Sequence, residues 1–133
     1  MAIVSLSAAA LASGSPATGT AGAALTAGEV VYTDTADSSK LKAAQNDTAA
    51  KCTAVGVMLN SCAAGEVAIY AASGVTINTS GLTAGEVYVV SSTAGDLELV
   101  TDLASAELTT IVGVASSATA LAININATGI AQP

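Results

Sequence analysis

The chain has 133 residues, a formal net charge of −7 at neutral pH, and no His, Trp or Phe. Its three basic residues are lysines, too few for the clustered cations that neutralise nucleic-acid phosphates. The missing imidazole excludes His-based catalysis and His metal sites, and two cysteines are too few for structural zinc. We therefore expect one small domain that is not an enzyme, holds no metal or cofactor, and binds no nucleic acid.

Residues 1–24 are rich in Ala, Ser, Gly and Thr, and they predict an extended N-terminal arm because Gly14, Pro16 and Gly19 disfavour a helix. The apolar run at residues 1–12 is shorter than the roughly 20 residues that span a bilayer, so we expect no membrane partner. It has the A-x-A ending of a signal peptide but lacks the basic residues that precede such a run. The sequence favours an apolar arm that docks on a partner, with a cleaved signal as the alternative.

From Leu25 onward the chain contains a repeated pattern. The sequence LTAGEV at residues 25–30 recurs at 82–87, and TAVGV at 53–57 recurs as TIVGV at 110–114, both 57 positions further along. Two matched blocks at one spacing indicate a duplicated unit. We place the units at residues 25–74 and 82–129, and interpret a third AGEV at 64–67 as the same turn used again.

Short β-strands are predicted throughout both units. Each AGEV supplies a glycine turn followed by a Val- and Tyr-rich run, which predicts strands at 30–32, 67–70 and 87–90. Further strands are predicted at 40–42, 55–59, 75–78, 97–100, 111–114 and 121–125, and short helices at 46–52 and 102–108. We predict an all-β fold with minor helices, a small barrel or sandwich of two tandem units in one domain at 25–133.

Three glutamates, Glu29, Glu66 and Glu86, follow a glycine at the start of a predicted strand. Two carboxylates that approach each other could perform acid–base catalysis. The repeat explains them more simply, as solvent-facing residues of one turn type. We therefore assign no catalytic residue.

Two acidic groups lie in predicted turns, Asp34 with Asp37, and Asp96 with Glu98 and Asp102. A calcium loop places its ligands at alternate positions and closes with a Gly and a Glu, and neither group has that spacing. We interpret both groups as solvated turn residues, with a weak surface cation site as the alternative.

The two cysteines, Cys52 and Cys62, flank a predicted strand. In a hairpin of strands 53–59 and 66–70, Cys52 lies far from the turn and Cys62 lies in it. A disulfide needs close Cα atoms, so we expect two free thiols.

The order of these blocks resembles the capsid decoration (cement) proteins of tailed bacteriophages. The resemblance rests on the Ala/Gly/Thr-rich start, LTAGEVVY, an Asp/Ser loop into KLKA, a short NDTA segment, TAVGVMLNSCAAGEVAIYAASGV, and LTAGEVYVVSSTAGDLELV. It implies a viral structural protein on the outer surface of the virion's capsid, with the major capsid protein as partner. It also implies self-association, most often as a homotrimer.

By this resemblance the arm would contact the capsid lattice, through the apolar residues Ala2, Ile3, Val4, Leu6, Leu11 and Pro16. The alternative function is a fibre, spike or other adhesion module of a virion or cell surface. Such a module would need a groove lined by aromatic residues, and the chain has three Tyr and no Trp.

Overall fold

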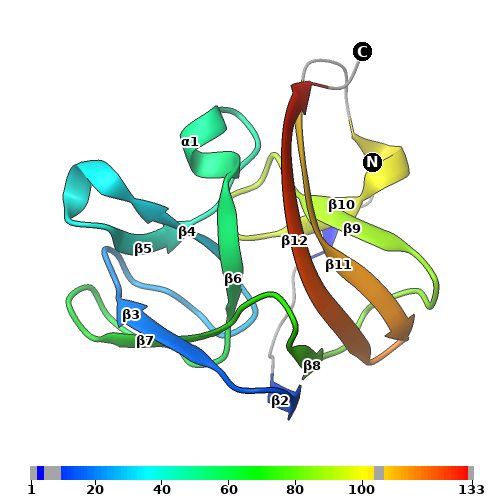
Figure 1. Cartoon of the computed structure of the whole chain (residues 1–133), viewed down its shortest axis with the longest axis horizontal. Coiled ribbons are helices and arrows are strands. Elements are labelled where there is room, and N and C mark those ends of the chain that lie inside the picture. Colours follow the sequence, from blue (N-terminus) through cyan, green and yellow to red (C-terminus); the bar gives the residue numbers. More distant parts are fainter. Residues whose placement is uncertain (1–2, 5–9, 104–106, 132–133) are drawn as a thin grey trace.

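The computed structural model describes residues 3–4, 10–103 and 107–131, and its fold is all-β (Figure 1). The strands form two antiparallel sheets, so the predicted fold class is confirmed. In the five-stranded sheet the strand order is β3-β7-β6-β4-β5, and in the seven-stranded sheet it is β1-β10-β9-β11-β12-β8-β2.

Every predicted strand overlaps an observed one. The five-stranded sheet comprises β3 (Ala17–Thr20), β4 (Val30–Asp34), β5 (Lys40–Ala43), β6 (Ala54–Met58) and β7 (Val67–Ala71). The seven-stranded sheet comprises β1 (Ile3–Val4), β2 (Ala10–Ser13), β8 (Thr76–Asn78), β9 (Val87–Val90), β10 (Leu97–Leu99), β11 (Leu108–Ser117) and β12 (Ala120–Ala131). The strands β1, β2 and β3 were not predicted, because residues 1–24 as a whole are rich in small residues.

The two predicted helices have different outcomes. Within 46–52, α1 (Ala49–Cys52) forms behind the side chain of Thr48, which accepts from the Lys51 amide at 3.4 Å. The predicted helix at 102–108 is wrong at both ends. Asp102 is the last residue of a 3₁₀ turn, η2 (Val100–Asp102), and Leu108 is the first residue of β11. Residues 104–106 lie outside the described chain. The Leu108 amide donates to the carbonyl of Asn46 at 3.3 Å, so it makes no hydrogen bond within a helix.

Five strands of the seven-stranded sheet repeat the strand order of the five-stranded sheet, and the central pair repeats its register. β3-β7-β6-β4-β5 corresponds to β8-β12-β11-β9-β10, and we call β3–β7 the first unit and β8–β12 the second unit. In β4 and β6 the pairs are Val30–Val57, Val31–Gly56 and Tyr32–Ala54. In β9 and β11 they are Val87–Val114, Tyr88–Gly113 and Val89–Ile111, each 57 positions further along. Both pairings have an irregularity at the same place, so the repeated sequence blocks occupy matching structural positions.

The glycine of each T-x-V-G-V block lies where strands approach closely. A Cβ on Gly56 would collide with the main-chain oxygen of Ala71, and a Cβ on Gly113 would collide with that of Ala122. Only glycine fits these two matching positions without moving a neighbouring strand.

The N-terminal segment contributes strands to both sheets. β1 pairs with β10 and β2 with β8, at opposite ends of the seven-stranded sheet, whereas β3 pairs with β7. After β3, Ala21 bridges to Leu41, and the Gly22 amide donates to the Leu41 carbonyl at 2.8 Å. β3 thereby contacts β5, and the two edges of the five-stranded sheet meet. The described part of the predicted arm is integral to the domain's sheets.

The central strands β4 and β6 of the five-stranded sheet are buried on both faces. One face and the loop after β3 enclose a small core of their own, formed by Ala21, Leu25, Val31, Leu41, Met58 and Ala68. The other face packs into a larger core shared with the seven-stranded sheet, which includes Val30, Tyr32, Val57, Tyr88, Leu97, Val112, Leu121 and Ile123. The two sheets are therefore joined by one apolar core.

Candidate functional site

The structure does not bring the predicted capsid-contact residues to one place. Ile3 and Val4 form β1 beside β10, and Leu11 lies in β2 at the opposite end of the same sheet. The Leu11 side chain is 41% exposed, and Pro16, just before β3, is exposed as well. The remaining two residues, Ala2 and Leu6, lie outside the described chain. Leu11 and Pro16 are thus accessible to a partner.

The turn glutamates act within their own turns. Glu29 Oε1 accepts from the Thr26 amide at 2.6 Å, and Glu66 Oε1 accepts from the Ala63 amide at 2.6 Å. In the third turn the Thr83 amide donates to the Tyr88 hydroxyl at 2.8 Å. Glu29 and Glu66 therefore stabilise their own turns, and in the third turn Tyr88 makes a corresponding contact with the main chain.

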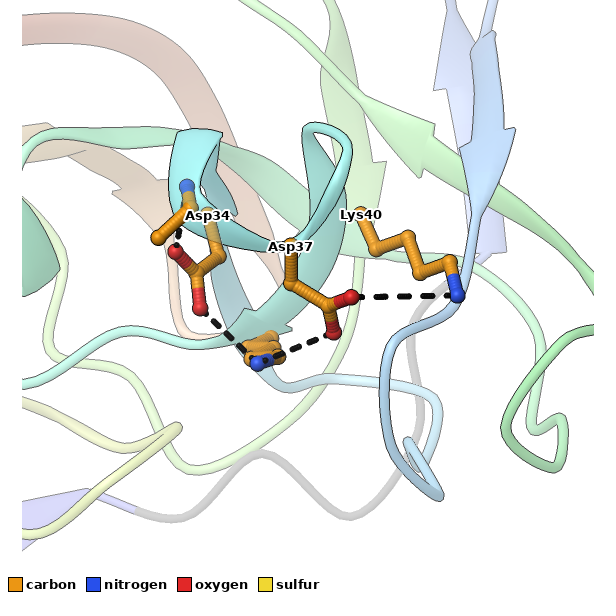
Figure 2. Close-up of polar contacts among 5 residues, drawn as sticks. Asp34, Asp37 and Lys40 are labelled. Atoms are coloured by element: carbon orange, nitrogen blue, oxygen red, sulfur yellow. Dashed lines mark hydrogen bonds and ion pairs between the residues drawn. The ribbon is translucent and has the colours of Figure 1, made fainter.

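The turn between β4 and β5 contains an ion-pair cluster (Figure 2). Lys42 Nζ lies 2.8 Å from Asp34 Oδ2 and 3.2 Å from Asp37 Oδ2, and Lys40 Nζ lies 3.9 Å from the other Asp37 oxygen. The ammonium of Lys42 therefore occupies the place that a metal cation would take between the two carboxylates. Its hydrogen bond lowers the pKa of Asp34, and the two aspartates raise the pKa of Lys42.

This turn also has an unusual backbone. Ser38 and Ser39 have φ values of 55° and 57°, in the left-handed region that residues other than glycine seldom adopt. Asp34 Oδ1 accepts from the Ala36 amide at 3.0 Å, which fixes the preceding 3₁₀ turn η1 (Thr35–Asp37). The cluster thus holds a tight connection between neighbouring strands. This explains the acidic pair without a bound cation.

A small cavity lies between α1 and the β11–β12 hairpin. Its volume is about 120 Å³, and its lining consists of Ala49, Cys52, Thr53, Leu108, Thr110, Ala127 and Thr128. The hydroxyl of Thr53 donates to the Ala49 carbonyl and that of Thr128 to the Thr109 carbonyl, so the cavity best fits a small apolar group.

Both cysteines are free. Cys52 is buried beside the cavity, where its Sγ lies 3.0 Å from Thr110 Oγ1, and Cys62 is half-buried in the loop after β6. Burial raises the pKa of both thiols. A protonated thiol is a poor nucleophile, so neither group is set up for covalent catalysis.

The main polar feature is a buried seam between the two units, formed by residues 44–46 of the first and 90–98 of the second. Asn46 is 2% exposed, and its Nδ2 donates to the Val90 carbonyl at 3.2 Å and to Glu98 Oε1 at 3.3 Å. The Asn46 amide donates to the Ser91 carbonyl, and the Gly95 amide donates to the Ala44 carbonyl. Two main-chain segments from different units are thereby held in register.

Glu98 is the one member of the predicted solvated acidic group that the structure contradicts. Its side chain is fully buried, and its Oε2 has no hydrogen-bond partner among the described residues. Burial first, and the negative charges of Glu107 and Asp102 next, raise its pKa to about 7. The interpretation of Glu98 as a solvated turn residue is wrong, because it lies in β10 and the seam covers its side chain.

The described residues contain no group of three or more acidic or Cys side chains placed to hold a metal ion. Within that part of the chain, no helix is long and apolar enough to cross a membrane. No family model matches the chain, and no curated protein matches it significantly. Function must therefore be argued from the sequence and from this geometry.

Proposed function

We propose that this chain is a capsid decoration protein that binds the outer surface of a tailed-phage head and stabilises contacts between major capsid subunits. Its copies would assemble with one another, as the homotrimer expected from the sequence resemblance. The chain acts by binding in this proposal, and it performs no reaction.

One observation carries the proposal: the acidic side chains of the β4–β5 turn, of two AGEV turns and of the buried seam each have a structural role in the fold. The aspartates of the β4–β5 turn hold Lys42. Glu29 and Glu66 hold their own turns, and Glu98 is buried against Asn46. What the domain offers to a partner is exposed apolar surface on the seven-stranded sheet, at Leu11, Val114 and Ile130.

The test is binding to empty heads of the tailed phage that, on this proposal, encodes the chain. We expect the purified chain to sediment with expanded heads and to raise the temperature at which they fall apart. The substitution Leu11→Asp should weaken that binding, whereas Val67→Asp, on the other sheet, is the matched control. A chain that stays in the supernatant with all head forms would refute the proposal. Localisation of the chain to a tail fibre or spike in purified virions would favour the adhesion module instead.

A further inference from the structure

One face of the seven-stranded sheet has an uncharged row of residues that reaches the surface. The row runs across five neighbouring strands through Val87, Val114, Ala122, Thr76 and Ser13, which pair with one another in that order. Val114 is 44% exposed, Ala122 and Ser13 are exposed, and the other two are partly exposed. We call these five residues the outer row.

The first unit has the same row in a different environment. Val30, Val57 and Ala71 pair across β4, β6 and β7 as Val87, Val114 and Ala122 pair across β9, β11 and β12. The residue types are therefore identical at three matching positions.

The burial of the two rows differs completely. The three residues of the first unit are all 0% exposed, in the core shared by the two sheets. There β6 contacts β11 and β12, whose Val112 and Ile123 belong to the same core. The Val-Val-Ala row of the first unit is thus a surface on which a β-sheet of this chain packs. Its twin in the second unit has the same side chains and no sheet over it among the described residues.

Charge indicates what could cover the outer row. The chain carries −7, so two copies repel each other over most of their surfaces. None of the five residues of the row is charged, although Glu86 directly precedes Val87 in the turn before β9. Two copies can therefore pack on the row itself without burying a charged side chain of the row.

We propose that the outer row is the surface on which a second copy of this chain packs. We rest this inference on the self-association in the proposed function and not on capsid binding. The contact combines apolar burial at the two valines with close approach at Ala122 and Ser13. Because the row is short, the association is expected to depend on protein concentration rather than to be permanent.

The experiment is sedimentation velocity of the full chain over a concentration series, for the wild type and for Val114→Lys. We expect reversible oligomers in the wild type, and an apparent Kd at least about tenfold higher in the variant, because an unpaired ammonium would be buried in the contact. Val67→Lys is the matched control, since Val67 is a 63% exposed strand valine away from the row and its substitution changes the net charge equally. Ala122→Lys tests the same face from a different strand.

Circular dichroism and thermal unfolding establish that each variant is folded. The proposal is supported if either folded row variant loses self-association while Val67→Lys keeps it. It is overturned by a wild type that stays monomeric, by row variants that associate like the wild type, or by equal loss in the control. Capsid binding by the same variants is measured separately. A monomeric wild type whose capsid binding is lost in Val114→Lys would show that the capsid covers the row, which refutes the second copy but not the decoration function.

Discussion

Replacing Glu98 with glutamine tests the buried seam between the two units. Glutamine keeps the size of the side chain and an oxygen that can accept from Asn46 Nδ2, now 3.3 Å from the carboxylate. It removes the ability to ionise, and it replaces the second carboxylate oxygen with an amide group that donates hydrogen bonds. Since Glu98 is fully buried with one oxygen unpaired, ionisation is the costly event at this position.

The magnitude follows from the pKa of Glu98, which the fold raises from 4.5 to about 7. In the unfolded chain this carboxyl ionises as the pH rises through its ordinary pKa, while the folded protein keeps its proton. The free energy of unfolding therefore falls as the pH rises between about 4.5 and 7, and levels off above that. One pKa unit corresponds to about 1.4 kcal/mol, so the total loss is on the order of 3 kcal/mol.

The assay is urea denaturation of the wild type and Glu98→Gln at several pH values from 4 to 8. Contributions that are the same in both proteins cancel in the difference between them. We expect the variant to gain about 3 kcal/mol on the wild type between the two ends of the series. Glu86→Gln controls for the loss of one negative charge away from the seam. A wild-type-to-variant difference that stays constant with pH would refute the assignment of Glu98 as a buried, proton-holding group.

Three further predictions concern other parts of the fold. Gly113→Ala should lower the free energy of unfolding by about 1–3 kcal/mol in denaturant titrations, because its Cβ would meet a main-chain oxygen of β12, and an unchanged midpoint would contradict this. Cys62, which is half-buried, should react with a thiol reagent well before the buried Cys52, and equal rates in the native protein would show that the site near α1 opens readily. Lys42→Met should raise the pKa of Asp34 in an NMR titration, because its main stabilising hydrogen bond is lost, and an unshifted titration would speak against the ion pair.

The strands of the repeated units were predictable because their residues carry both signals that a strand needs. Val87–Val90 combines a glycine turn with β-branched and aromatic residues, and 121–125 alternates apolar with small or polar side chains. In Ala10–Ser13 and Ala17–Thr20 the signal is weak, because alanine and glycine disfavour strands and only Leu11 and two threonines offset them. Those strands form because β8 and β7 offer open edges, which is information from elsewhere in the chain.

The candidate site was harder to predict for a related reason. Alternation in Leu97–Leu99 assigns Glu98 to a polar face, which is correct for a sheet with one solvated side. Residues 44–46, more than fifty positions away, cover that side. The sequence around Glu98 contains no pattern that predicts this contact. The helix predicted at 102–108 failed similarly, since the carbonyl of Asn46 engages the Leu108 amide.

The duplicated rows allow one more test, in which sequence context is matched and burial alone differs. Val57 and Val114 occupy the same position of T-x-V-G-V and pair with valines in matching strands, but Val57 is 0% exposed and Val114 is 44% exposed. Val57→Ala removes two buried methyl groups and should cost about 2 kcal/mol of unfolding free energy. Val114→Ala loses mainly strand preference and should cost less than about 1 kcal/mol.

Both variants are measured by urea denaturation at a concentration where the wild type is monomeric, so that self-association does not contribute to either value. Equal costs at the two positions would mean that the second unit's row is covered within the monomer, or that the first unit's row is not buried against the other sheet. A large cost at Val57 alone would show that the two copies of one sequence motif differ in what packs over them. That difference is what leaves the outer row available to a partner.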